Sequence, residues 1–199
     1  MFNEEEFIKL KEKALKEHIP IIMDDTLEKL KEILEKENPK RILEIGTAVG
    51  YSALCFARYT KEAIIDTIEI DEERYKEAVN NLEKVGFKDR INLIYGNAVD
   101  ILPTIKNKYD IVFIDAAKSK YSIFLEESLK LLNNNGLILA DNVLYKGYVM
   151  SDYNKHKQRT AVRHLREYIK EITENPDFET EILDIGDGLA ITKVHSSNA

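Results

Sequence analysis

The feature that most constrains the fold of this 199-residue chain is a regular alternation of short apolar runs with amphipathic stretches from residue 41 onward. Helical patterns separate short β-type runs at residues 41–44, 63–70, 91–95, 110–114 and 137–140. Apolar runs of this length, bounded by turn residues, are typical of buried strands. Repeated β-α-β units favour a mostly parallel sheet with helices on both faces. We therefore expect a doubly wound α/β fold.

The N-terminal region departs from this alternation. Residues 4–17, and a second segment that begins near Asp25 and stops before Pro39, have the apolar spacing of amphipathic helices. We see no linker and no internal repeat in the sequence. The chain is therefore expected to form a single domain over residues 1–199, with a helical N-terminal extension at about residues 1–38.

The C-terminal region contains a different signal. Two β-type runs, residues 178–185 and 189–194, are joined by Gly186-Asp187-Gly188, which predicts a hairpin and hence an antiparallel strand. Upstream, the Asn-rich residues 133–136 predict a turn, and the polar residues 145–157 predict a long loop.

Composition limits the class of protein. Hydrophobic residues make up 44% of the chain and charged residues 33%, as in ordinary globular proteins. No apolar run reaches the roughly 18 residues of a membrane span, and the acidic N-terminus does not resemble a secretory signal, so no membrane partner is expected. The lone Cys55 excludes an internal disulfide and favours a cytoplasmic location. A net charge of −7 argues against nucleic acid covering the whole surface.

A glycine-rich turn after the first strand of the alternation predicts a cofactor site. In residues 43–52, Leu-Glu-Ile-Gly-Thr-Ala-Val-Gly-Tyr-Ser, Gly46 and Gly50 allow a tight turn and a close ligand. The G-x-x-x-G spacing differs from the dinucleotide fingerprint, and Glu44 would repel a pyrophosphate. An acidic residue suits a cationic cofactor such as S-adenosylmethionine (SAM). A purely structural turn remains the alternative.

The ends of the next two strands extend this prediction. Glu69 closes the second strand, where a carboxylate can accept hydrogen bonds from both ribose hydroxyls. The alternative, that Glu69 helps to cap the following helix, is weakened because Asp71 can do so itself. After the third strand, the small Ala98 leaves room for an adenine ring, and Asn97 could bond the edge of the base.

A second cluster lies at the ends of the following strands. Asp115 ends one apolar run, and Asp141 and Asn142 end the next. If these strands are neighbours, two carboxylates and an amide oxygen converge, which is a ligand set for magnesium or another divalent cation. Such an ion makes a bound hydroxyl more acidic. The alternative is that both aspartates are simply turn formers at strand ends.

Lys118 lies three residues after Asp115. It could take the proton of the substrate hydroxyl or hold the resulting oxyanion. A solvated loop lysine is the alternative that the sequence leaves open.

These motifs together resemble the cation-dependent class I O-methyltransferases, the family of catechol and caffeoyl-CoA O-methyltransferases. Asp-Ala-Ala-Lys at residues 115–118 is similar to the D-A-x-K motif of the family, and Asp-Asn at residues 141–142 to its D-N motif. The resemblance covers about residues 19–194. It implies a Rossmann-like, seven-stranded, mostly parallel sheet, usually in a homodimer.

The resemblance also implies roles for individual residues. Those around SAM would be Ile22, Met23, Glu44, Gly46, Ser52, Glu69, Asn97, Ala98 and Asp115. Asp115, Asp141 and Asn142 would bind Mg²⁺, and Lys118 would act as base next to Asp115.

Within the family, the short chain and the ending at residues 185–190 resemble bacterial tRNA 5-hydroxyuridine methyltransferases. This likeness implies tRNA as partner and 5-methoxyuridine as product, with a small catechol-like molecule as the alternative. A basic cluster could bind phosphates; it comprises Lys155, His156, Lys157, Arg159, Arg163, His164 and Arg166. A solvated helix start explains the same pattern equally well.

Two other classes of function were weighed. A nucleotide-dependent oxidoreductase is disfavoured by the missing G-x-G-x-x-G motif and by the three predicted metal ligands. A non-catalytic binding protein is disfavoured because the residues expected for chemistry, including Lys118, are all present.

Overall fold

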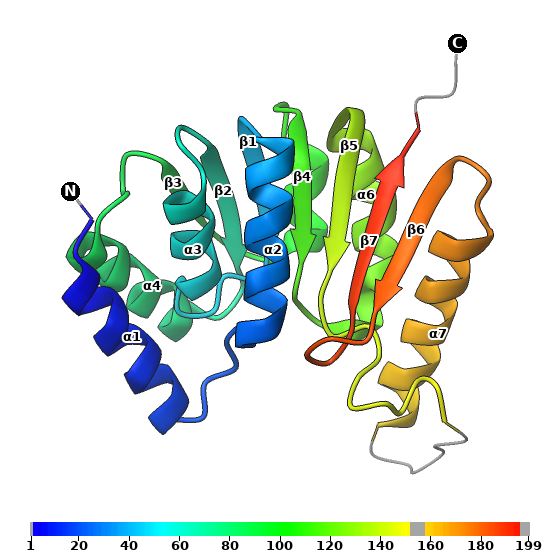
Figure 1. Cartoon of the computed structure of the whole chain (residues 1–199), viewed down its shortest axis with the longest axis horizontal. Coiled ribbons are helices and arrows are strands. Elements are labelled where there is room, and N and C mark those ends of the chain that lie inside the picture. The colour runs from blue at the N-terminus through cyan, green and yellow to red at the C-terminus, as the bar shows by residue number, and fades with distance from the viewer. Residues whose placement is uncertain (1, 152–157, 196–199) are drawn as a thin grey trace. The chain divides into compact units, whose positions relative to one another are not determined.

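The computed structural model describes residues 2–151 and 158–195. The chain divides into two compact units, Met1–Ile101 and Leu102–Ala199, each of which is described in its own right (Figure 1). Both units combine parallel strands with helices.

The first unit begins with two helices, α1 (Glu4–Lys16) and α2 (Asp24–Glu37), followed by alternating strands and helices. These elements are β1 (Arg41–Ile45), α3 (Tyr51–Tyr59), β2 (Ile64–Glu69), α4 (Glu72–Val85), β3 (Ile91–Tyr95) and α5 (Ala98–Ile101). The strands are parallel and lie in the order β3-β2-β1. Because the strands are parallel, their carboxyl ends, where Glu44 and Glu69 lie, share one edge of the sheet.

Local chemistry explains where the helices of this unit begin. The side chain of Asn3 accepts a hydrogen bond from the backbone N–H of Glu6 at 3.2 Å, which caps α1. The Asp71 side chain caps α4 in the same way, by accepting from the Arg74 N–H at 2.9 Å. The Phe7 ring of α1 stacks on the ring of Tyr51, with their centroids 5.2 Å apart. The predicted N-terminal helix is therefore docked by aromatic packing.

The second unit contains the remaining strands. Its elements are the 3₁₀ turn η1 (Leu102–Thr104), β4 (Tyr109–Ile114), η2 (Lys118–Lys120), α6 (Tyr121–Leu131), β5 (Leu132–Ala140), α7 (Arg159–Glu174), β6 (Phe178–Leu183) and β7 (Leu189–Val194). β4 and β5 are parallel, β7 runs antiparallel to β5, and β6 runs antiparallel to β7. Figure 1 shows α7 beside the hairpin that β6 and β7 form.

The predicted fold class is confirmed: an α/β chain with seven strands, mostly parallel, and an antiparallel C-terminal hairpin. The predicted boundaries of β3 and β7 are reproduced to the residue. Strands β1, β2 and β4 are buried along nearly their whole length and the amphipathic helices bury one face, which makes this pattern readable.

The predicted turn at residues 133–136 needs correction. Strand β5 already begins at Leu132, which pairs with Tyr109, whereas Leu137 pairs with Ile111. The register shifts between these pairs, so the asparagines bulge out of the strand. Asn135, with φ 58°, takes the left-handed conformation that asparagine tolerates. The polar run therefore interrupts the ladder without ending the strand.

Two predictions from composition can be compared with the structure. In residues 2–151 and 158–195, no helix has the length and apolar character needed to cross a membrane. Cys55 is fully buried in α3, and burial raises the pKa of its thiol to about 12. A cysteine in this environment is structural and unreactive.

Candidate functional site

The glycine-rich turn of the first unit adopts a backbone that requires its residue types. Gly46, Ala48 and Gly50 have φ values of 102°, 47° and 85°, so three alternate residues lie in the left-handed region. Gly50 is the N-cap residue of α3, and its N–H donates to the carbonyl of Thr47 at 2.9 Å. The Gly46 N–H donates to the Ile68 carbonyl at 3.0 Å, whereas the Ala48 N–H donates to a side chain.

The side chain that accepts the Ala48 N–H is Glu69, which closes β2. Glu69 Oε2 accepts the Ala48 N–H at 2.7 Å, and Glu69 Oε1 accepts the Asp71 N–H at 2.8 Å. Only 7% of Glu69 is exposed. Each carboxylate oxygen can accept a second hydrogen bond, so the two oxygens are held in place and can still receive two vicinal hydroxyls. This geometry favours a ribose and disfavours a phosphate.

Glu44 lies deeper than the sequence indicates. It is fully buried, and its Oε2 accepts a hydrogen bond from the Thr67 hydroxyl on the neighbouring strand. The Thr67 and Thr47 hydroxyls lie 2.6 Å apart, so this chain of hydrogen bonds reaches the glycine-rich turn. Sequence reasoning missed both threonines; their only signal was that polar residues occupy positions of buried strand ends.

The other predicted cofactor residues of this unit lie near strand or helix ends. Met23, which is half exposed, precedes α2 and follows the buried Ile22. Ser52 is the second residue of α3. Asn97 Oδ1 accepts the Val99 N–H at 3.1 Å, so this side chain helps to begin α5, whose first residue is the buried Ala98. Contacts of all these residues with the cofactor remain predictions.

In the second unit, the predicted metal ligands do lie together. Asp115 follows β4, and Asp141 follows β5, its parallel neighbour. The Asn142 side-chain amide lies 3.5 Å from Asp115 Oδ1, and the Asn142 backbone N–H donates to Asp141 Oδ1 at 2.7 Å. Asn142 has φ 61°, a left-handed conformation that turns its side chain back toward the strand ends.

Electrostatic strain marks this cluster. Burial, followed by the nearby negative charge of Asp115, raises the pKa of Asp141 to about 7. Asp141 is only 3% exposed, so water stabilises its charged form little, whereas the Asp115 side chain is 33% exposed. A divalent cation between them would relieve the repulsion.

Lys118 is held inside the cluster. Its Nζ lies 3.3 Å from Asp115 Oδ1 and donates to the Tyr121 hydroxyl at 3.0 Å. The Tyr121 hydroxyl in turn donates to the backbone carbonyl of Asp141 at 2.8 Å. With its side chain 17% exposed, Lys118 is no solvated loop lysine. Sequence reasoning missed Tyr121, although its offset of three residues from Lys118 was a usable signal.

The donor set of this cluster fits a hard cation. Two carboxylates and a side-chain amide supply oxygen donors, which Mg²⁺ prefers. The described residues contain no group of three or more His, Cys, Asp or Glu side chains suited to a metal, so Asn142 would have to provide the third oxygen. Its amide would need to present Oδ1 to the ion, an orientation reached by a half-turn of the side chain.

The predicted nucleic-acid residues divide into two groups. Arg159 and Arg163 are exposed on α7, with Arg163 Nε 3.8 Å from a Glu167 carboxylate oxygen. Arg166 instead donates to three backbone carbonyls of the same unit. Its guanidinium thus makes bonds within the unit, although Arg166 is exposed like the other two, and the role predicted for all three in binding nucleic acid stays a prediction. Lys155, His156 and Lys157 lie outside the described residues.

Together, the α/β fold, the acidic ribose-type site and the two-carboxylate cluster define the class of enzymes that transfer a group from a cationic nucleoside cofactor. The O-methyltransferase family model matches residues 3–194. The catechol O-methyltransferase of Niastella koreensis is 32% identical over 165 residues, covering 78% of this chain and 73% of its own. The caffeoyl-CoA O-methyltransferase of Populus kitakamiensis is 31% identical over 171 residues, with coverages of 81% and 72%.

Solved structures agree with these relatives. A candidate caffeoyl-CoA O-methyltransferase from Staphylococcus aureus is 35% identical, with a TM-score of 0.89 over 94% of this chain and 91% of its own. An O-methyltransferase from Bacillus cereus, in complex with S-adenosylhomocysteine (SAH), is 25% identical, with a TM-score of 0.85 and coverages of 96% and 91%.

The chain belongs to the O-methyltransferase family and is a SAM-dependent enzyme of the caffeoyl-CoA and catechol type. The oxidoreductase and non-catalytic alternatives are thereby set aside. The predicted family resemblance is confirmed.

Proposed function

We propose that the enzyme transfers a methyl group from SAM to a ring hydroxyl that has a second oxygen on the adjacent carbon, with the help of a divalent cation such as Mg²⁺. The observation that carries this proposal is the cluster of Asp115, Asp141, Asn142 and Lys118 in the second unit. Two carboxylates brought together at low exposure are costly unless a cation or a catalytic need balances them.

Each residue of the cluster has a distinct part in this proposal. Asp115, Asp141 and Asn142 would hold the cation, which when bound makes the acceptor hydroxyl more acidic. Lys118 already donates to Asp115 and Tyr121, so one of its three N–H donors is left for the acceptor oxygen. In its neutral form the same Nζ can take the hydroxyl proton. The acceptor oxygen then attacks the methyl carbon, the C–S bond breaks, and SAH leaves.

The residues of the first unit would serve the cofactor. Glu69 is held by two backbone N–H groups, so its oxygens are oriented for the ribose hydroxyls without further rearrangement. The negative charge of Glu44 favours the amino group and sulfonium of SAM. Gly46, Ser52, Asn97 and Ala98, with Ile22 and Met23, complete the proposed set of this unit.

Two acceptors share the required pair of adjacent oxygens. A catechol-like small molecule is supported by the relatives named for catechol and caffeoyl-CoA. The 5-hydroxyuridine of a tRNA anticodon loop has a hydroxyl next to a carbonyl oxygen, and the exposed Arg159 and Arg163 supply positive charge for the phosphates of the tRNA.

We also propose that the enzyme is a homodimer and is located in the cytoplasm. Sedimentation of the purified enzyme would test the dimer.

The two acceptors can be separated by experiment. Nucleosides from a strain lacking this protein are compared with wild type by mass spectrometry, and the purified enzyme is assayed with SAM and catechol. Loss of 5-methoxyuridine identifies the tRNA acceptor, whereas unchanged nucleosides with catechol turnover identify a small molecule. Failure of both assays would overturn the proposed pair of acceptors.

A further inference from the structure

Residues 143–151, the segment that follows Asp141 and Asn142, are held by hydrogen bonds to other parts of the second unit. Its first residues bond to the β6–β7 turn: the N–H of Val143 donates to the Gly188 carbonyl at 3.0 Å, and the N–H groups of Leu144 and Tyr145 donate to the Asp187 carbonyl. Leu144 packs so closely over Gly188 that a Cβ there would lie 2.4 Å from Leu144 Cγ. The hairpin turn therefore fixes the start of the segment.

The other end of the segment is held by one side chain. Arg166 Nε donates to the carbonyl of Val149 at 3.0 Å, and its Nη2 donates to the carbonyls of Tyr148 at 3.3 Å and Ser151 at 2.5 Å. A planar guanidinium can serve several carbonyls at once, which a lysine ammonium at the same place could not match. Figure 1 shows the segment running from the end of β5 past the β6–β7 turn toward α7.

The segment needs such anchoring because its own backbone is unfavourable. Tyr145, Lys146 and Gly147 have φ values of 45°, 57° and 73°, three consecutive residues in the left-handed region. For a residue with a Cβ this conformation costs about 1–2 kcal/mol. Internal bonds are few: the N–H of Tyr148 donates to Tyr145 at 3.1 Å, and that of Val149 to Leu144 at 3.3 Å.

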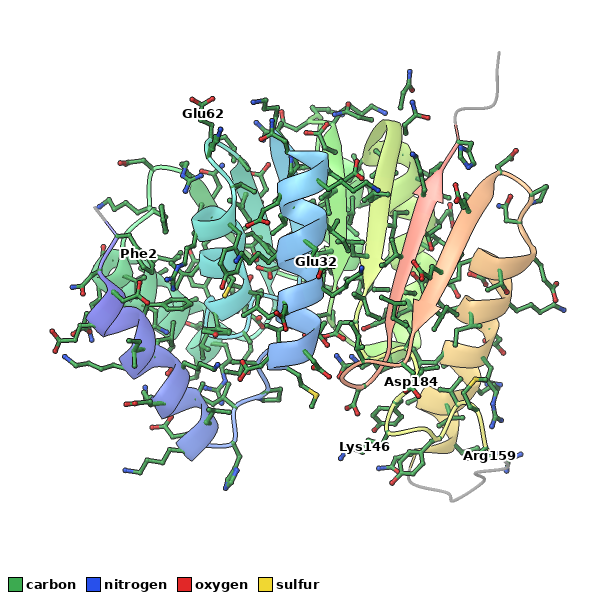
Figure 2. All side chains as sticks on the ribbon, in the orientation of Figure 1. Phe2, Glu32, Glu62, Lys146, Arg159 and Asp184 are labelled. Carbon is green, nitrogen blue, oxygen red and sulfur yellow. The ribbon has the colours of Figure 1, made fainter. Side chains whose placement is uncertain are left out.

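The anchor itself is rigid. Arg166 lies on α7, whose opposite face is buried through Val162, Leu165, Tyr168 and Ile172. Figure 2 labels two other cationic side chains near its lower edge, Lys146 in the segment and Arg159 at the start of α7. Arg166 thus joins a packed helix to a strained segment that follows Asp141 and Asn142 directly.

We propose that Arg166 is a positioning residue for methyl transfer: by bonding three carbonyls of segment 143–151, it keeps this segment in the conformation that binds the methyl acceptor. The proposal rests on the proposed function in placing the acceptor beside Asp141 and Asn142. The segment carries a pair of half-buried rings, Tyr145 and Tyr148, with centroids 5.9 Å apart, that could contact an aromatic acceptor.

Hydrogen exchange tests the anchor without metal or acceptor. In full-length Arg166→Ala, the amides of Tyr148 and Val149 should exchange at least about tenfold faster than in wild type, because the segment opens locally. The Val143 amide, bonded to the hairpin turn, should change less. Arg163→Ala, on the same helix, is the matched control and should leave all three amides unchanged. Equal exchange in Arg166→Ala and wild type would overturn the proposal.

Kinetics tests the positioning role. Arg166→Ala should raise the KM for catechol, or for tRNA isolated from the strain lacking the enzyme, about tenfold, while kcat stays within about threefold. The KM for SAM should not change, and Arg166→Lys should recover only part of the loss. A parallel fall in SAM affinity, or an unchanged acceptor KM, would contradict the role. The exchange result stands apart from both acceptors, so failure of the proposed function is distinguishable.

Discussion

The two units treat their buried acids in opposite ways. In the first, Glu69 receives two backbone N–H groups and Glu44 receives the Thr67 hydroxyl, so both carboxylates are stabilised by the fold. In the second, burial and then the nearby charge of Asp115 raise the pKa of Asp141. Glu69 is thus held in place before a cofactor arrives, whereas the two aspartates, even with Lys118 beside Asp115, would be stabilised further by added positive charge. The comparison suggests that one unit is preorganised for recognition and the other is poised for chemistry.

The largest effect should follow removal of a ligand from the second unit. Asp141→Ala should lower metal-dependent methyl transfer by about a thousandfold or more, since the cation that activates the hydroxyl would be lost. SAH affinity, measured by calorimetry, should stay within about twofold of wild type because the first unit is intact. Substantial activity of this variant in Mg²⁺ would show that Asp141 is not needed for metal-dependent transfer, and that the second unit does not differ from the first in the proposed way.

A tenfold to hundredfold effect is expected in the first unit. Glu69→Ala should weaken SAM and SAH binding by about that factor, because two hydroxyls lose a charged acceptor. Equilibrium binding of SAH measures this loss, and circular dichroism checks the fold. Glu73→Ala, exposed on α4, is the matched control and should bind like wild type. Equal affinities in the two variants would remove Glu69 from the ribose site.

The pH dependence of stability separates the units further. The folded-state pKa of Asp141 is about 7, above its usual 3.8, so the folded protein binds more protons than the unfolded chain between these values. Unfolding free energy of the metal-free enzyme should therefore fall as pH rises from about 4 to about 7.

Asp141→Asn keeps the shape without the charge and should remove this loss. At pH 8 it should be more stable than the metal-free wild type by about 2–4 kcal/mol in urea unfolding, while being inactive. Mg²⁺ should reduce this difference in unfolding free energy, because the ion should stabilise only the wild type. A variant less stable than wild type at pH 8 would show that the carboxylate is not strained.

A smaller effect concerns the exposed arginines. Arg159→Glu with Arg163→Glu should weaken tRNA binding up to about tenfold at low salt and leave catechol turnover unchanged. Filter binding across a salt series measures the change. Unchanged tRNA affinity would remove this surface from the proposed function.

The smallest effect, essentially none, is expected at Cys55. Its buried thiol, with the pKa raised to about 12, should not react with a thiol reagent in the native enzyme at pH 7. A spectroscopic titration with and without denaturant measures it. Rapid labelling of the native protein would show that the packing of α3 opens readily.

Much of the fold could be read from the sequence because the apolar runs here follow burial closely, as at β2 and β4. The cluster of Asp115, Asp141 and Asn142 was also predictable, since parallel strands bring their carboxyl ends to one edge. The Asn-rich bulge of β5 was not, because a register shift depends on the partner strand rather than on local residues.

The hydrogen-bond partners of several side chains could not be predicted from the sequence either. Nothing in the spacing of α7 distinguishes Arg166, which bonds three carbonyls, from the exposed Arg163. Likewise Glu69 accepts the Ala48 N–H of a turn that lies more than twenty residues away in the sequence. Long-range partners of this kind are set by tertiary structure and have no local sequence signal.

The most direct test of the central claim is methyl transfer from isotope-labelled SAM to catechol by the wild-type enzyme, measured in chelator and again after Mg²⁺ is restored, with SAH affinity measured in both conditions. If the first unit binds the cofactor and the second needs a cation for chemistry, chelator should abolish transfer and Mg²⁺ should restore it. SAH affinity should be the same in both conditions. Full transfer in chelator would contradict the account.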